Sequence, residues 1–246
     1  MDRIAVISDI HGNITALETV AGDIKRRMIQ TVINLGDHLS GPLWPKETIQ
    51  FLMKQDWIHI SGNHDRQLTK NDPATHGPSD SFTYKLLDDE DKDWLKSLPS
   101  EKYFDDEIYL CHGAPGNDHV YLLETVENGR ARLSNANEII KKLNSFTSKI
   151  ILCGHTHVPG VVQLNNIMIV NPGSVGLQAY DDVTPEPHII ENGSPHARYM
   201  ILEKRDNNWF TELIFIPYDY DKAAEQARKN NRPDWEVALR TGYMKF

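Results

Sequence analysis

Ser8-Asp9-Ile10-His11-Gly12-Asn13 directly follows the first apolar run of the chain, Arg3–Ile7, which is rich in branched residues. Such a run predicts a central strand of a sheet that is covered on both faces. Asp9 and His11 therefore lie at the carboxyl end of a strand, where open α/β sheets place their ligands. A carboxylate and an imidazole two residues apart can turn toward one point, although ordinary turn chemistry also explains the pair.

A helix is expected directly after this turn, because Asn13 or Thr15 can cap its first turn. The residues that follow at helical spacing are apolar, namely Leu17, Val20, Ala21, Ile24 and Met28. A helix with one apolar face packs against a sheet, so the first strand and this helix form one unit of an α/β fold.

The same unit recurs twice. Residues 31–35 form a second apolar run, which ends in Gly36-Asp37-His38, and a helix from Pro45 to about residue 54 follows. Residues 57–60 form a third run, which ends in Ser61-Gly62-Asn63-His64-Asp65. Three such units predict a largely parallel sheet in which each strand ends in residues that can bind a metal.

Two later apolar runs end in histidines. Residues 107–111 precede His112, and residues 150–153 precede Gly154-His155-Thr156-His157. Between the runs, the acidic residues 88–91 are expected to open a helix, since carboxylates suit a helix N-terminus. The polar stretches 66–81 and 114–132 are expected to be irregular.

The second half of the chain changes to a pattern of antiparallel hairpins. Residues 161–170 predict one hairpin and residues 197–216 another, separated by a long loop over 181–195. Two short helices close the chain, and the second is expected to end at Gly242. No linker or repeat interrupts this order, so we expect a single domain over residues 1–246.

Composition limits the class of protein. Of 246 residues, 39% are hydrophobic and 25% are charged, as in an ordinary globular domain. No apolar run reaches the roughly 18 residues of a membrane span, and the N-terminus lacks the apolar core of a signal peptide. We therefore expect a cytoplasmic protein without membrane contacts. The net charge of −9 argues against general nucleic-acid binding. Cys111 and Cys153 are expected to be buried free thiols.

The candidate site residues follow five separate strands of the same predicted sheet region, and they are Asp9, His11, Asp37, Asn63, His64, His112, His155 and His157. Turn or core chemistry explains any one of them but not the whole set. In order and spacing they resemble the calcineurin-like metallophosphoesterase family, in its bacterial, phosphodiesterase-like branch. The matching motifs are Asp9-Ile10-His11, Gly36-Asp37, Gly62-Asn63-His64-Asp65, His112 and Gly154-His155-Thr156-His157, with residues 171–176 and 216–219 in the tail.

The resemblance implies an α/β fold, a four-layer α/β/β/α sandwich with two mixed β-sheets, and a dinuclear metal site. It implies that Asp9, His11 and His157 bind one metal and that Asn63, His112 and His155 bind the second. Asp37 would bridge the two metals. A bridging carboxylate offsets the repulsion of two dications roughly 3.5–4 Å apart. Oxygen and nitrogen ligands without thiolate favour divalent transition metals, with manganese preferred over iron, zinc, cobalt or nickel.

In that family the histidine of Gly-Asn-His is the general acid for the leaving group, which assigns this role to His64. Asp65 is the adjacent carboxylate, but the sequence does not identify the acid that orients His64. The alternative for Asp65 is that it is a surface turn residue. His38 either contacts substrate or is a loop histidine, which we favour. Arg66 either reaches a phosphate or is exposed or paired.

The resulting prediction is an enzyme, a metal-dependent phosphoesterase that hydrolyses phosphomonoesters, phosphodiesters or nucleotides through a metal-activated hydroxide. A serine/threonine protein phosphatase is one alternative. Those enzymes carry an arginine after a Gly-Asp-x-x-Asp motif, and this chain lacks it, since Gly36-Asp37-His38-Leu39-Ser40 stands there. A non-catalytic binding module of the same fold is another, and a nuclease would need a basic groove. The expected partner is a small phosphorylated or nucleotide substrate, chosen by loops 67–81, 114–132 and 181–196 around the metals. The oligomeric state stays open.

Overall fold

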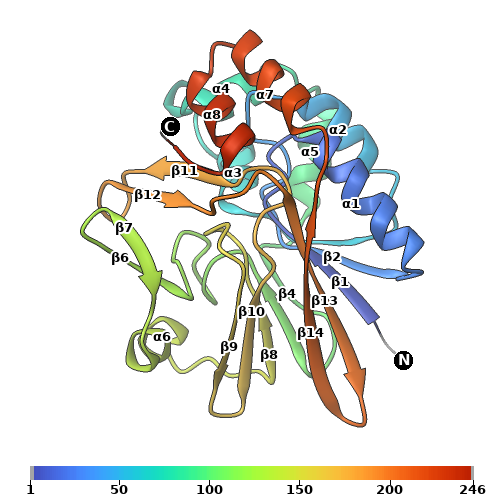
Figure 1. The fold of residues 1–246 in the computed structure, drawn as a ribbon, viewed down its shortest axis with the longest axis vertical. Helices are drawn as coiled ribbons and strands as arrows, with labels where there is room; N and C mark the ends of the chain where they lie inside the picture. The colour runs from blue at the N-terminus through green and yellow to red at the C-terminus, as the bar shows by residue number, and fades with distance from the viewer. Residues whose placement is uncertain (1–2, 245–246) are drawn as a thin grey trace.

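The computed structural model describes residues 3–244 and contains two mixed five-stranded sheets that face each other (Figure 1). The first sheet consists, from edge to edge, of β14 (Asn208–Ile216), β13 (Ala197–Arg205), β1 (Arg3–Ile7), β2 (Thr31–Asn34) and β3 (Ile58–His59). The second consists of β4 (Glu101–Tyr103), β5 (Ile108–Cys111), β8 (Ile150–Leu152), β10 (Ile167–Asn171) and β9 (Gly160–Leu164). The strands β1, β2 and β3 run parallel, and β9–β10 and β13–β14 are antiparallel hairpins, as predicted.

Alternate residues of the central strands pack on opposite faces of their sheets. Ile4 and Val6 of β1 belong to the cluster between the two sheets, together with Leu110 of β5. Ala5 and Ile7 belong instead to the cluster under the helices that cover the first sheet. Both faces of β1 are therefore buried, which explains why its sequence is apolar throughout.

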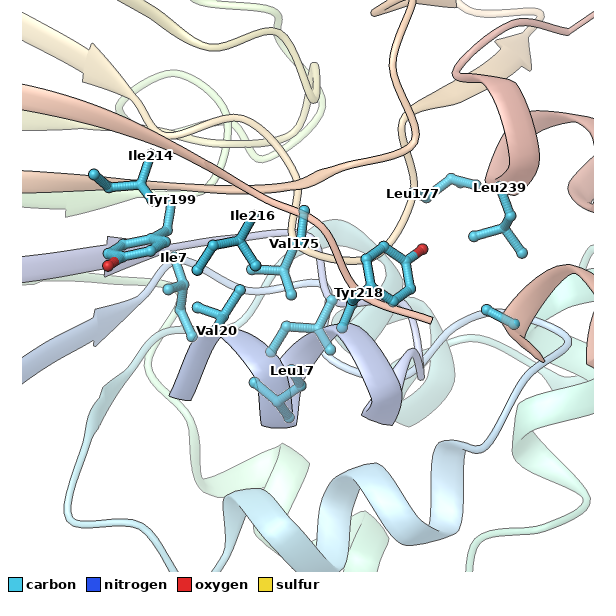
Figure 2. Close-up of a cluster of buried hydrophobic side chains, with 14 of the residues drawn as sticks. Ile7, Leu17, Val20, Val175, Leu177, Tyr199, Ile214, Ile216, Tyr218 and Leu239 are labelled. Carbon is cyan, nitrogen blue, oxygen red and sulfur yellow. The ribbon is translucent and has the colours of Figure 1, made fainter. Parts of the chain in front are cut away.

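Helices form the two outer layers. The first sheet is covered by α1 (Ile14–Arg26), α2 (Pro45–Leu52), α7 (Tyr220–Lys229) and α8 (Pro233–Thr241). Figure 2 shows Leu17 and Val20 of α1 packed near Ile7 of the first sheet. The second sheet is covered by α6 (Ala136–Leu143), through Ile139 and Leu143. The layers are α/β/β/α, so the predicted fold class is confirmed.

The helix after the first turn begins where the sequence predicts. The Asn13 side-chain oxygen accepts the Ala16 N–H at 3.2 Å, and its amide donates to the Gly176 carbonyl at 2.9 Å. The prediction that Met28 continues the apolar stripe is wrong. The helix ends at Arg26, and Met28 has a φ of +57° and is 86% exposed, because the chain there reverses toward β2.

A third sheet was not predicted. It consists of β11 (Ala179–Asp182), β12 (His188–Glu191), β7 (Arg130–Leu133) and β6 (Glu124–Glu127). Its strands lie partly in 114–132 and 181–195, so the expectation that these stretches are irregular is wrong. The strands are four residues long and half exposed, and β7 pairs with β12 across nearly sixty positions. Such short, distant pairings leave little local pattern.

The stretch 66–81 is also helical rather than irregular. It contains most of α3 (Asn63–Lys70), a 3-10 turn over Pro73–Thr75 and the start of α4 (Pro78–Tyr84). Polar residues dominate α3, and its first turn is held by the Asp65 carboxylate, which accepts the Gly62 N–H at 2.9 Å. The helix α5 (Asp89–Ser97) begins after Asp88, as predicted.

Two smaller expectations concern thiols and membranes. Cys111 and Cys153 are buried and not bonded to each other, which confirms their prediction as free thiols. Within residues 3–244, none of the helices combines the length and the apolar character that crossing a bilayer requires.

Leu110→Ala should lower the free energy of unfolding by about 2–5 kcal/mol, because Leu110 is fully buried between the two sheets. Ile140→Ala on α6 is the matched control, since Ile140 is 48% exposed and its loss should change stability by less than about 0.5 kcal/mol. Urea unfolding followed by circular dichroism measures both. Equal midpoints for the two variants would contradict the packing between the sheets.

Candidate metal centre

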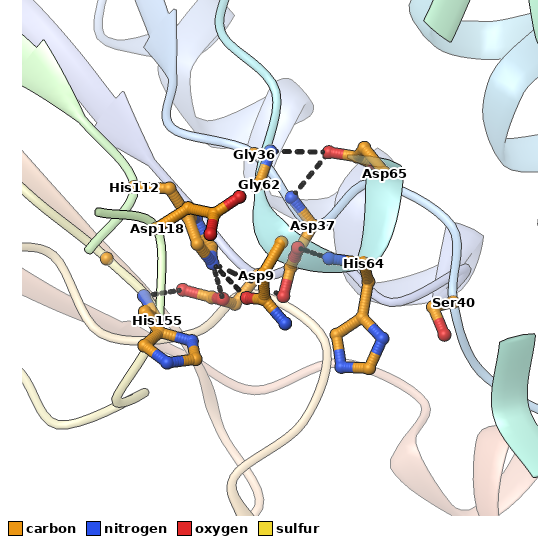
Figure 3. A network of polar contacts seen from close by, with 12 residues as sticks. Asp9, Gly36, Asp37, Ser40, Gly62, His64, Asp65, His112, Asp118 and His155 are labelled. Atoms are coloured by element: carbon orange, nitrogen blue, oxygen red, sulfur yellow. Dashed lines mark hydrogen bonds and ion pairs between the residues drawn. The ribbon is translucent and has the colours of Figure 1, made fainter. Parts of the chain in front are cut away.

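Five strand ends meet at one edge of the sandwich. Asp9 follows β1, Asp37 follows β2 and Asn63 follows β3, all in the first sheet, whereas His112 follows β5 and His155 follows β8 of the second. The strands were expected to share one sheet region, which is wrong, because the two facing sheets each contribute. Their carboxyl ends nevertheless point to one place, where the predicted site residues come together. Figure 3 shows five of them, Asp9, Asp37, His64, His112 and His155.

The ligand atoms form two groups. Asp9, His11 and His157 offer one set, and Asp37, His112 and His155 offer the other, with the atoms of each set within 4.8 Å of one another. His157 Nε2 lies 3.3 Å from Asp9 Oδ1, and His112 Nε2 lies 3.3 Å from Asp37 Oδ2. Asn63 joins the second group, because its Oδ1 lies 3.0 Å from His112 Nε2. All seven side chains are buried.

Backbone carbonyls fix the orientation of the imidazole rings. Nδ1 of His11 and of His157 each lies 2.7 Å from a backbone carbonyl oxygen, and Nδ1 of His112 lies 2.8 Å from another. A carbonyl accepts only from N–H, so Nδ1 of each ring carries a proton and Nε2, which points toward the centre, is the atom that can bind a metal when the ring is neutral. His155 is reversed, because its Nε2 lies 3.2 Å from the His119 carbonyl and its Nδ1 is left for a ligand.

The backbone of these turns is in the left-handed region, which L-residues seldom adopt. The φ values are +56° at Asp9, +51° at His11, +56° at Asp37, +69° at His155 and +60° at His157. Each left-handed residue costs roughly 1–2 kcal/mol relative to ordinary conformations. Strain of this kind gathers at functional sites, where the surrounding structure holds it.

Two glycines allow the chain to approach the carboxylates closely. A Cβ at Gly62 would collide with Asp37 Oδ1, and one at Gly154 would collide with Ser8 Oγ and lie 3.0 Å from Asp9 Oδ2. Backbone amides occupy the space instead: the His64 N–H donates to Asp37 Oδ1 at 2.9 Å, and the His155 N–H donates to Asp9 Oδ2 at 3.2 Å. The Gly62 and Gly154 positions therefore hold each carboxylate in place.

The charges of the centre favour a cation. Asp9 Oδ1 is buried without a hydrogen-bond partner. Burial alone would raise the pKa of Asp9, but the nearby charge of His157 lowers the pKa to about 2. Burial opposes the charged form of His112, yet the Asp37 charge raises its pKa to about 10. Burial lowers the pKa of His11 to about 4 and of His155 to about 3, so both are neutral ligands at neutral pH. The donor set fits two cations.

His64 lies beside this centre and is held by a carboxylate that the sequence did not identify. Its Nδ1 is 2.9 Å from Asp80 Oδ1, and Asp80, at the start of α4, also accepts from the Ser40 hydroxyl. Burial lowers the pKa of His64, but the Asp37 charge and the hydrogen bond to Asp80 raise it to about 9. The side chain is 33% exposed, so the imidazolium faces the cleft.

One feature of the sequence was an indirect sign of the role of Asp80. Residue 40 is serine where the Gly-Asp-x-x-Asp motif has its second acid, and the Ser40 hydroxyl now donates to Asp80. The adjacent Asp65 has another task, since its carboxylate accepts the backbone N–H groups of Asp37 and Gly62 at 2.9 Å each.

The two remaining candidates are structural. His38 lies in the loop between β2 and α2, as we favoured, and is fully buried there, with Nδ1 2.7 Å from Asp65 Oδ2. Arg66 binds Asp118 through two hydrogen bonds of 2.6 and 3.0 Å, which is the paired arrangement that the sequence left open.

A cleft of about 420 Å³ opens onto the centre. Its far wall was also missed, because Trp235 and Ala238 come from α8 and Tyr180 from β11, distant in sequence from every motif. Of the loops expected to surround the site, 77–79 and 181–183 line this cleft. The stretch 114–132 contributes from behind, where the Tyr121 ring lies 4.9 Å from the ring of His155.

The chain is similar in sequence, and in one case in structure, to known proteins. A solved metallophosphoesterase from Sphaerobacter thermophilus is 25% identical, with a TM-score of 0.74 and 98% of each chain covered. An uncharacterised protein of Methanocaldococcus jannaschii is 25% identical over 94% of each chain, and a phosphodiesterase of that organism is 22% identical over 82% of this chain and 99% of its own. The calcineurin-like phosphoesterase superfamily domain matches residues 2–188. The chain therefore belongs to the calcineurin-like phosphoesterase superfamily, and it is a hydrolase of phosphoric esters.

Proposed function

We propose that the protein hydrolyses phosphomonoesters, phosphodiesters or nucleotides at a dinuclear metal site, with His64 as the general acid. The observation that carries this proposal is the pair of ligand groups beside the His64–Asp80 hydrogen bond. The phosphodiesterase relative from Methanocaldococcus jannaschii supports diesters as one substrate class.

The ligand assignment follows the two groups. Asp9, His11 and His157 would hold one ion and Asn63, His112 and His155 the other, with the Asp37 carboxylate as the ligand that both would share. Bound there, the ions supply Lewis acidity to the phosphate oxygens and lower the pKa of a coordinated water. Manganese is our first choice of metal, with iron, zinc, cobalt or nickel as alternatives, and the absence of thiolate donors argues against a structural zinc site.

His64 would protonate the oxygen that leaves phosphorus. An imidazolium suits this task because it is the protonated form below its raised pKa, which lies near 9. Asp80 would act as a positioning residue, since its bond to Nδ1 directs Nε2–H into the cleft. Ser40 in turn supports Asp80 through its hydroxyl.

Asp37→Asn should reduce the bound transition metal from about two ions per chain to fewer than one. A neutral amide bridges two dications poorly, so both sites should weaken together. Elemental analysis after reconstitution with Mn²⁺ measures the effect. Asp93→Asn, at a 73% exposed side chain on α5, is the control for the change in charge and should keep both ions. Full metal content in Asp37→Asn would contradict the bridge.

His64→Ala should keep both metals and lower kcat by roughly 10²–10⁴-fold for an alkyl phosphate ester. The loss should be far smaller for p-nitrophenyl phosphate, because p-nitrophenolate leaves without protonation. Asp80→Asn should show the same dependence on the leaving group with a smaller loss. His112→Ala is the contrasting variant, since it should lose metal and slow both esters alike. Equal losses on both esters for His64→Ala would leave substrate positioning as its role.

A further inference from the structure

The cleft has a second half that the metal centre does not use. Its lining is apolar and aromatic, and it consists of Leu177, Ala179, Tyr180, Trp235, Ala238 and Met244. These side chains face the ligand residues across one continuous cleft of about 420 Å³. An ester whose phosphate lies at the centre can therefore place its organic group against this apolar wall.

Trp235 is the fixed part of the wall. Its ring lies 6.1 Å from the ring of His11, edge to face, and it is only 7% exposed. The chain at Gly41 passes so close that a Cβ there would lie 2.8 Å from the indole Cη2. The Arg232 guanidinium covers the indole at 5.5 Å. A ring held from several sides offers a rigid apolar surface at little entropic cost.

The charged side chains around the apolar half of the cleft are mostly carboxylates. Asp181, Asp182 and Asp234 line it, whereas Arg232 is the only lysine or arginine among its lining residues within 3–244. That guanidinium is already engaged: Nη2 donates to Asp234 Oδ2 at 2.6 Å, and Nη1 donates to the Ser79 hydroxyl at 2.8 Å. A second phosphate would thus meet carboxylates rather than a free cation.

We infer that the cleft selects phosphoesters whose organic group is apolar, aromatic or cationic, and that it rejects those with a further anionic group, such as nucleoside polyphosphates. This inference rests on the proposed function of the metal centre. Carboxylates attract cations, and aromatic faces bind cations as well as apolar groups. The accepted class therefore includes cationic groups.

The charge part is tested with two esters that differ by one phosphate, thymidine 5′-(p-nitrophenyl phosphate) and its 3′-phosphorylated derivative. Release of p-nitrophenolate by the Mn²⁺-loaded protein should show kcat/KM about tenfold lower for the derivative. Asp234→Asn removes one carboxylate and frees Arg232, so this ratio should narrow at least threefold. Asp93→Asn, which changes net charge away from the cleft, should leave the ratio at the wild-type value.

The apolar part is tested with phenyl p-nitrophenyl phosphate against methyl p-nitrophenyl phosphate, which share a leaving group. Wild-type protein should prefer the phenyl ester by about tenfold in kcat/KM. Trp235→Leu should reduce this preference, and Trp235→Phe, which retains a ring and disturbs folding less, should reduce it by a smaller factor. Circular dichroism checks that each variant is folded.

The outcomes separate the two levels of the proposal. If Mn²⁺-loaded protein hydrolyses the methyl ester but both ratios are near one, the cleft does not select and this inference is overturned while the phosphoesterase stands. If no ester is hydrolysed by metal-loaded protein, the proposed function itself is overturned, and the inference with it.

Discussion

The centre depends on the backbone hydrogen bonds that join the turns after β1 and β2. The Asp9 N–H donates to the Gly36 carbonyl, and the Ile10 and His11 N–H groups donate to the Asp37 carbonyl, each at 3.0 Å. These bonds hold two carboxylates side by side in a buried place, where their mutual repulsion is large. The left-handed φ values of both aspartates follow from this geometry. Without the joined turns, His112 and His155 of the second sheet would have no carboxylates beside them.

The second sheet completes the arrangement through its own strand ends. The His155 N–H donates to Asp9 Oδ2, and the Val175 and Gly176 N–H groups donate to the Ser8 and Asp9 carbonyls at 3.0 Å. The contact between the sheets is apolar along the strands, and the polar candidate ligands meet at this edge. The hydrophobic packing therefore aligns the sheets, and the polar edge uses that alignment to bring five strand ends together.

Much of this arrangement could be predicted from the sequence, because strand ends and ligands are local signals. The run Arg3–Ile7 and the motif Gly62-Asn63-His64-Asp65 identified both the strands and the residues at their ends. Asp80 could not be found in this way, because its role arises only when α4 folds back over Ser40. The third sheet was missed for a similar reason, since Ile189 pairs with Arg130 at a distance that periodicity does not detect. The helix α3 was missed because it has few apolar residues. Its first turn is held by hydrogen bonds of the Asp65 carboxylate instead.

The two halves of the cleft come from separate parts of the chain. Every proposed metal ligand precedes residue 158, whereas the apolar wall begins at Leu177 and is completed by Trp235 and Ala238 of α8. The two halves meet where the Trp235 ring packs edge to face on His11, so a substitution at Trp235 would also reach a proposed metal ligand. Substitutions elsewhere on the wall, such as at Ala238, would change the shape of the cleft and leave the turns after β1 and β2 in place, so one scaffold could present different walls to different esters.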